Sequence, residues 1–119
     1  SKELRTGMTT ADILIVPFRP SQPDLDTLPK VQELISQARD FNPELKSLAL
    51  LTMAPSNPVV HEAQEAQEYL ADFPTLTLLK TIIRDRKAYR DAMSEGMGVV
   101  EMKNDKALGE IESLMSEVL

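Results

Sequence analysis

The sequence predicts an α/β fold in three layers, with a parallel sheet of about three strands and helices on both sides. Short apolar segments alternate with longer segments that are apolar on one side only, as in strands joined by crossover helices. The strands are expected at residues 12–18, 47–53 and 75–83. Each is apolar at successive positions, which is typical of strands covered on both faces. The 119 residues fit one domain, and no linker or repeat divides them.

The first half of the chain is expected to form two helices around the first strand. Residues 2–10 predict a short helix before the strand at 12–18. A second helix is expected to start near Asp24 or Asp26, with Pro29 in its first turn, and to end near residue 40. Its apolar residues recur at spacings of three and four, which predicts a buried stripe. The stripe consists of Leu28, Val31, Leu34, Ile35 and Ala38.

The second half is expected to contain three more helices. Asn57-Pro58 predicts a helix start, with an Asn cap and a proline at the first helical position, and this helix is expected to end near residue 71. A helix over residues 84–95 should end at Gly96, followed by an extended piece at 98–102. Asp105 is expected to cap the last helix. The inward residues should be Ala88, Tyr89, Ala92 and Met93, and then Ala107, Leu108, Ile111, Leu114, Met115 and Val118.

Composition excludes several classes of chemistry. There is no Cys, so disulfides and thiolate zinc sites are excluded. The single histidine, His61, is expected at a solvated helix surface and leaves histidine-built metal sites and catalytic triads unsupported. The sequence contains no GxxxxGK[ST] loop, no GxGxxG and no Gly-x-Ser-x-Gly. We therefore do not expect this chain alone to be a complete enzyme.

Two features remain as candidate sites. Ligands of parallel sheets bind beyond the carboxyl ends of the strands, which is where the proline-rich loop at residues 17–24 lies. Its acids Asp24 and Asp26 fit a metal or acid–base pair, but they fit the role of helix-dipole partners better. The second feature is a run of four cations and one acid over residues 84–90, in a chain of net charge −6.

Two segments of the sequence together indicate a family. The first is ADILIVPFRPS at residues 11–21, followed by Asp24. The second is TIIRDRKAYRDA at residues 81–92, followed by Gly96, by Val99-Val100-Glu101 and by Lys106-Ala107. In order and spacing they resemble the ParA-type partition ATPases, a deviant Walker A family that includes the MinD-type septum-site proteins, and the resemblance covers nearly the whole chain. It implies that residues 1–119 are the C-terminal half of a P-loop NTPase domain, and that the longer parent protein carries the phosphate loop.

The resemblance also implies a nucleotide site. The parent is expected to use ATP and Mg²⁺, with neither bound to this part alone. The loop after the first strand would lie beside the nucleotide and near a dimer interface, and the end of the second strand near the adenine. Family members often have Asn at the latter position, where this chain has Met53 and Ala54. The implied cofactor-binding positions are Pro17, Pro20, Ser21, Asp24, Met53 and Pro55.

Family members bind DNA without sequence specificity through basic residues in this half. The matching cations here are Arg84, Arg86, Lys87 and Arg90. Phosphate contacts need only positive charge within reach. The alternative is a solvated face whose charges are balanced locally, as by Lys87 and Asp91 four residues apart. The implied partners are a second copy of the protein, DNA and a centromere-binding adaptor protein, in the bacterial cytoplasm at the nucleoid and without a membrane.

Other functions remain open from sequence. One is a non-enzymatic protein-interaction module, and another is a MinD-like positioning ATPase. The acids Glu110, Glu112 and Glu117 of the last helix have the wrong charge for a membrane-binding helix. A KGGxGKTT-type loop encoded upstream of Ser1 would distinguish the ATPases from the interaction module. The strand at 12–18 is also expected to have one edge that is bare, covered by residues 2–10, or paired with a second copy.

Overall fold

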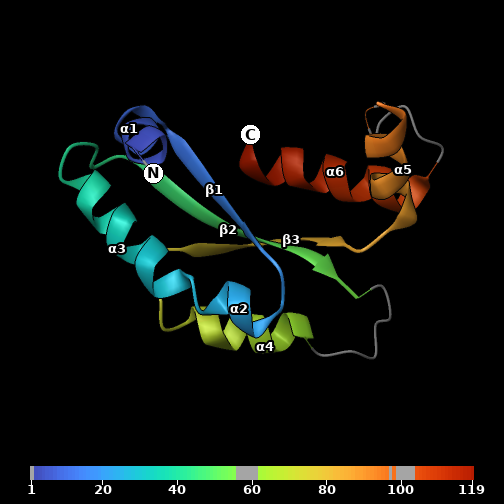
Figure 1. Cartoon of the computed structure of the whole chain (residues 1–119), viewed down its shortest axis with the longest axis horizontal. Helices are drawn as coiled ribbons and strands as arrows, with labels where there is room; N and C mark the ends of the chain where they lie inside the picture. Colours follow the sequence, from blue (N-terminus) through green and yellow to red (C-terminus); the bar gives the residue numbers. More distant parts are fainter. Residues whose placement is uncertain (1, 56–61, 97, 99–103) are drawn as a thin grey trace.

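Three parallel strands form a sheet in the order β1-β2-β3, which confirms the predicted α/β class. The computed structural model describes residues 2–55, 62–96, 98 and 104–119 (Figure 1). The strands are β1 (Ile13–Phe18), β2 (Lys46–Ala54) and β3 (Thr77–Arg84). Because β2 pairs with both neighbours, it is the central strand, while β1 and β3 are edge strands among the described residues.

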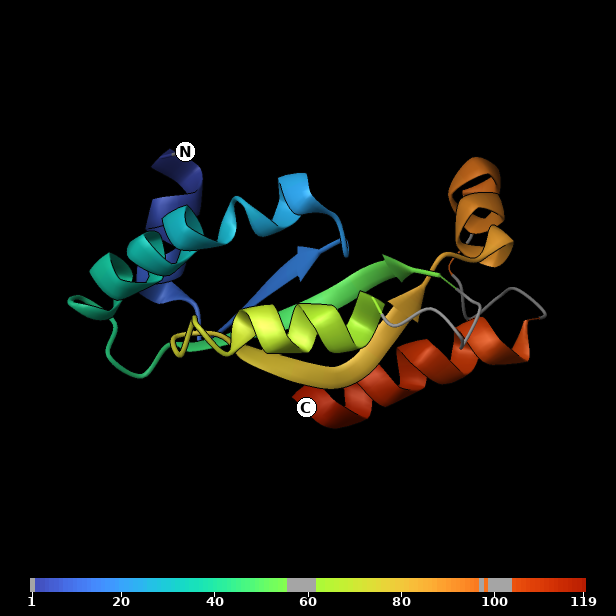
Figure 2. The same ribbon diagram turned by 90° about the horizontal axis from the view of Figure 1, so that it is seen from below.

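Six helices flank the sheet in the described part of the chain. They are α1 (Lys2–Thr10), α2 (Gln22–Leu25), α3 (Leu28–Arg39), α4 (Glu62–Leu70), α5 (Lys87–Glu95) and α6 (Asp105–Val118). Helices α3 and α4 lie on one side of the sheet, and α6 runs along β3 on the side away from β2 (Figure 2). Helix α5 stands at the end of the molecule where β2 and β3 terminate (Figure 1).

The main core lies between one face of the sheet and helices α3 and α4. Leu28 and Ile35 of α3 are completely buried, as the spacing in the sequence predicts. Ala49 and Leu51 of β2 face them in the same cluster, together with Ala66 of α4. A fully buried aliphatic side chain contributes about 1.5–3 kcal/mol to stability. This cluster therefore fixes the sheet and, with it, the position of the strand ends.

β1 is less covered than its sequence predicts. Ile15 remains 37% exposed, and Pro17 is exposed as well. The expectation of burial on both faces thus holds for β2 and fails for β1, which has a strand on one side only among the described residues. Helix α1 does not pair with this edge. It packs on α3 and inserts Met8 into the core.

The predicted helix at residues 24–40 is divided into α2 and α3. Pro29 lies in the first turn of α3, where its missing N–H is tolerated, but it cannot donate to a carbonyl one turn earlier. Leu25 therefore ends the first helical turn and Thr27 caps the next helix. The Thr27 hydroxyl donates to the Asp24 carbonyl at 2.6 Å, which stabilises the turn between them.

Two further boundaries differ from the expectation. Helix α5 begins at Lys87 because Arg84 still pairs with Ala54 of β2 and is the last residue of β3. The cap of α6 is Asn104, whose Oδ1 accepts from the Ala107 N–H at 2.9 Å, and Asp105 is the first helical residue instead. Gly96 ends α5 with a left-handed φ of 67°, as predicted.

Some of the positions expected to face inward on α5 and α6 are exposed instead. Ala88 and Ala92 are buried as predicted, but Met93 is 86% exposed and Met115 is 53% exposed. Met93 is exposed because α5 stands at the end of the sheet instead of lying on it (Figure 1). The predicted helix start at residues 57–58, His61 and the extended piece at 99–102 lie outside the described residues.

Candidate functional site

The carboxyl ends of the three strands meet at one edge of the sheet. Thr52, near the end of β2, donates its hydroxyl to the carbonyl of Phe18 at the end of β1, at 3.3 Å. Arg84, the last residue of β3, donates from its guanidinium to the Pro55 carbonyl at 2.7 Å. Two of the residues singled out in the sequence, Pro55 and Arg84, are thus brought into direct contact although they belong to different predicted sites.

A pocket of about 390 Å³ opens at this edge. It lies within the size range of small-molecule sites. Most of its surface is apolar, three arginines are among the residues that line it, and it combines β2, β3 and α5. We call it the carboxyl-edge pocket, and its lining residues are Thr52, Met53, Ile83, Arg84, Asp85, Arg86, Tyr89, Arg90, Met93 and Ser94.

Met53 has an unusual backbone conformation in this pocket. Its φ is 52°, in the left-handed region, and it is the one non-glycine residue with positive φ in the described chain. Such a conformation costs roughly 1–2 kcal/mol for an L-residue with a Cβ. The side chain is also 55% exposed at the pocket, so its burial does not offset this cost. Strain of this kind is concentrated at functional sites.

Three of the four predicted DNA-contact cations are paired with carboxylates. Arg86 bonds to Glu110 at 3.0 Å, Lys87 to Asp91 at 3.0 Å and Arg90 to Asp85 at 2.5 Å. Arg84 is directed to the Pro55 carbonyl. Four cations with three carboxylates leave a formal charge of +1 on this cluster, which we call the basic cluster. Its positive field is therefore weaker than the sequence count predicts.

Glu110 of α6 joins the end of the sheet to α5. Its carboxylate accepts from the Arg86 guanidinium, from the Tyr89 hydroxyl at 2.7 Å and, more weakly, from the Arg84 N–H at 3.4 Å. The hydrogen bond to Glu110 raises the pKa of Arg86 further. Burial, and then the bond to Glu110, raise the pKa of Tyr89. Sequence reasoning missed Glu110, because no local pattern links it to residues 20 or more positions away.

The proline-rich loop after β1 is closed by a salt bridge. Asp24 accepts from the backbone N–H of Arg19 at 2.7 Å, and its other oxygen accepts from the guanidinium at 3.0 Å. The hydrogen bonds from Arg19 lower the pKa of Asp24. Ser21 precedes α2 and makes no side-chain capping bond. Pro20 lies between these residues, and the loop follows β1 at the same edge of the sheet without lining the carboxyl-edge pocket.

The residues present fit part of a nucleotide and not all of it. A planar base matches the size and the apolar lining of the carboxyl-edge pocket. In the described residues no glycine-rich loop leads from a strand into a helix, so phosphate binding has no counterpart here. The described part of the chain also contains no group of three acidic or histidine side chains that could hold a metal ion. We therefore derive no role for Mg²⁺ from these residues.

The chain is similar in sequence to a known protein. No family model matches the chain. The chain is 30% identical over 114 residues to maintenance of carboxysome distribution protein A of Halothiobacillus neapolitanus. The match covers 94% of this chain and 51% of the relative, so the chain spans about half the length of this curated relative.

None of the helices in the described part of the chain is long and apolar enough to cross a bilayer.

The similarity to a carboxysome distribution protein and the three-stranded α/β sheet agree with the resemblance found in the sequence. Together they support the ParA/MinD-type family as the one this chain resembles, without singling out the partition ATPases within it.

Proposed function

We propose that this chain supplies the base-binding side of an ATP-dependent positioning protein of the ParA/MinD type. The observation that carries the proposal is the carboxyl-edge pocket, with the strained Met53 at its wall and apolar surfaces suited to a planar ring. The similarity to a distribution protein over 94% of the chain supports it. In this proposal the phosphates and Mg²⁺ are held by parts of the protein outside these 119 residues.

Nucleotide binding is the first test. The sequence encoded upstream of Ser1 should contain a KGGxGKTT-type loop, and its absence from the full gene product would contradict the proposal. In that gene product, Met53→Lys should weaken binding of a fluorescent ATP analogue by about tenfold or more, because a charge enters the apolar wall. Met115→Lys is the matched control, since Met115 is similarly exposed on α6, outside the pocket. Equal weakening by both variants, or none by either, would also contradict it.

The second part of the proposal is DNA binding by the basic cluster. Arg84 supports it, because its guanidinium bonds to a backbone carbonyl and its charge remains available to an anion. Arg84→Ala together with Arg90→Ala should weaken binding to double-stranded DNA and flatten its salt dependence. Lys30→Ala is the control, since Lys30 is an exposed cation on α3 away from the cluster.

The acids of the cluster give a test in the opposite direction. Asp85→Asn removes the partner of Arg90 and should strengthen DNA binding and steepen its salt dependence. Asp26→Asn changes the net charge equally at the residue that follows α2 and should have a smaller effect. If the arginine variants bind DNA as the wild type does at low salt, the basic cluster is not the DNA site.

The cargo is also part of the proposal. The relative's name concerns carboxysome distribution, whereas the partition ATPases move plasmids or chromosomes with a centromere-binding adaptor. We propose that the full protein forms ATP-dependent dimers on DNA and distributes a cargo through an adaptor protein. Deleting the gene and then imaging candidate cargoes distinguishes the two kinds of cargo. A protein-based body loses its even spacing if the cargo is of the carboxysome kind, and a plasmid does so if the cargo is DNA. If neither changes its position, the positioning function is wrong.

A further inference from the structure

β3 contains an irregularity in its pairing with β2. Leu78 pairs with Ala49 and Ile82 pairs with Leu51, so β3 takes four residue steps where β2 takes two. Such a bulge re-aims backbone groups that would otherwise alternate between the two sides of a strand. Here the N–H groups of the successive residues Lys80 and Thr81 both point away from β2, toward α6.

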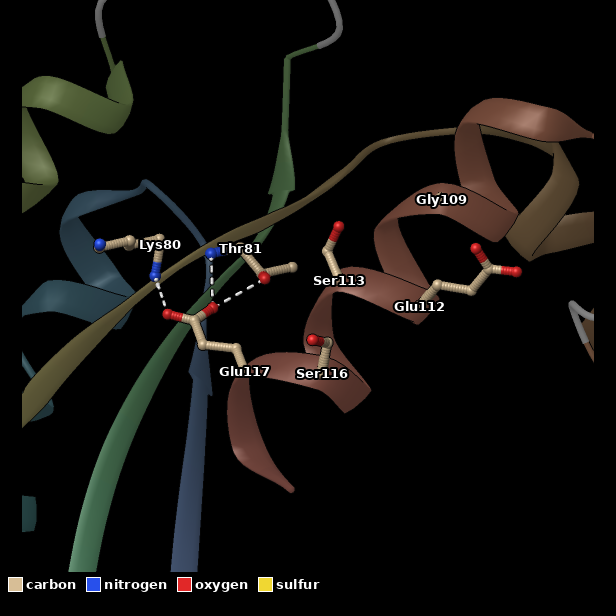
Figure 3. A pocket seen from close by; sticks show the side chains of 7 residues that line it. All are labelled: Lys80, Thr81, Gly109, Glu112, Ser113, Ser116 and Glu117. Carbon is tan, nitrogen blue, oxygen red and sulfur yellow. Dashed lines mark hydrogen bonds between the residues drawn. The ribbon is translucent and has the colours of Figure 1, made fainter.

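Glu117 of α6 occupies this bulge. Its carboxylate accepts from the Lys80 N–H at 2.6 Å, from the Thr81 N–H at 2.9 Å and from the Thr81 hydroxyl at 2.7 Å (Figure 3). These are charge-assisted bonds, which are stronger than bonds between neutral groups. One carboxylate thus satisfies two edge amides, as the carbonyl oxygens of a neighbouring strand otherwise would.

A second glutamate of α6 acts on the same edge. Glu110 lies seven residues before Glu117, so the two side chains project from the same side of the helix, two turns apart. Glu110 accepts, at longer range, from the N–H of Arg84 at the end of β3. α6 lies along β3 (Figure 2). Its carboxylates therefore contact the outer edge of the strand at two points.

We infer that α6 is a built-in cover for the β3 edge, and that Glu117 keeps this edge closed to the β3 strand of a second copy. An edge strand with unpaired amides is a template for pairing with another chain. The segment TLLKTIIR at residues 77–84 has the β-branched and apolar composition that such pairing needs. Because the bulge amides bond to Glu117, a second β3 can add to this edge only after Glu117 is displaced.

The test uses the chain itself and a fluorescent peptide of residues 77–84. Glu117→Ala should bind the peptide at least about tenfold more tightly than the wild type, since two edge amides lose their partner. Hydrogen exchange at Lys80 and Thr81 should become faster in this variant and slow again when the peptide is added. Glu112→Ala is the matched control, because Glu112 lies on the same helix with its carboxylate pointing away from β3 (Figure 3).

Two conservative variants keep the test decisive if Glu117→Ala fails to fold. Glu117→Gln retains one acceptor oxygen, and Thr81→Val removes only the hydroxyl bond, so both should bind the peptide with intermediate affinity. The inference is overturned if exchange at Lys80 and Thr81 is unchanged in the folded variants. It is equally overturned if exchange becomes faster while peptide binding stays at the level of the wild type and of Glu112→Ala.

Discussion

The strain at Met53 is the clearest single-residue feature of the carboxyl-edge pocket. The left-handed backbone at this position suits Asn, which adopts positive φ more readily than other residues with a Cβ. The ATPase family that the sequence resembles is expected to have Asn often at the end of this strand, where this chain has Met53 and Ala54, and the left-handed backbone at Met53 is compatible with that residue type. Met53 therefore keeps the conformation at a cost that the rest of the sheet edge must offset.

Substitutions at Met53 measure this cost. Met53→Asn should leave the free energy of unfolding unchanged or raise it slightly, whereas Met53→Val should lower it by about 1 kcal/mol or more. Urea denaturation of the three proteins gives the comparison. Met93→Val, at an exposed helical position in the same pocket, is the control and should cost less than Met53→Val. Equal stability of the Asn and Val variants at residue 53 would show that φ is not constrained there.

The Arg86–Glu110 pair should stabilise the chain far more than its exposed neighbour pair. The Arg86 and Glu110 side chains are 18% and 13% exposed, whereas Lys87 and Asp91 are 80% and 36% exposed. Glu110→Ala removes the carboxylate that accepts from the Arg86 guanidinium and leaves the Tyr89 hydroxyl only the Ala107 carbonyl, at 3.2 Å. It should lower the free energy of unfolding by about 2 kcal/mol or more.

Asp91→Ala is the matched control for this prediction. It breaks the exposed pair, which is worth about 0.5 kcal/mol or less. Chemical denaturation at neutral pH measures both variants. If Glu110→Ala costs no more than Asp91→Ala, the link between α5 and α6 does not stabilise the fold.

Sequence reasoning found many of the residues at this edge but not their partners. Position and the family resemblance predict Met53, Pro55 and the four cations as site residues, and the structure brings most of them together. Glu110 could not be found in this way, because its contacts with Arg86 and Arg84 span more than 20 residues. The weakening of the basic cluster by local acids follows from those unseen contacts.

At the scale of elements, strand and helix types were predictable and their ends were not. A periodic pattern of apolar residues predicts which side chains are buried, and the apolar residues of α3 and β2 are buried as this pattern predicts. The ends depend on individual bonds: Asn104 takes the cap of α6 from Asp105, and strand pairing holds Arg84 in β3. Such bonds compete within about one kcal/mol, so composition alone does not decide between neighbouring residues.

The contact between α6 and β3 should weaken as the pH falls into the acid range. Burial raises the pKa of Glu117, but the bonds from Lys80 and Thr81, with the charge of Lys80, outweigh it and lower the pKa overall. A carboxyl with a lowered folded pKa stabilises the fold fully above its unfolded pKa of about 4.3. This contribution is lost as the pH falls through the folded pKa.

Glu117→Gln isolates that contribution. The wild type should exceed the variant in free energy of unfolding at about pH 6, and this difference should shrink toward about pH 3. Denaturation curves at both pH values measure it, with Glu112→Gln as the control on the same helix. A difference that is constant with pH would mean that the Glu117 carboxylate is not held by the edge amides.

At the scale of the whole molecule, the two edges of the sheet differ: the β3 edge is covered by a helix, and the β1 edge has no strand partner among the described residues. α6 covers the β3 edge, whereas β1 has a strand partner only in β2 among the described residues. A cleft of about 180 Å³ with an almost entirely apolar lining lies between α1, β1 and α3, with Leu4, Ile15 and Pro17 among its residues. The apolar composition of β1 predicts a strand that is covered on both faces. The described strands and helices leave part of β1 exposed.

This asymmetry predicts that the 119-residue chain associates with itself through β1 as its concentration rises. Ile15→Lys should shift that association to higher concentration, because a lysine on an edge strand opposes pairing between chains. Light scattering over a concentration series measures the mean mass. Met93→Lys adds the same charge at an exposed site on α5 and should leave the association unchanged. A wild-type chain that stays monomeric throughout, or equal effects of the two lysines, would show that the β1 edge is not where chains meet.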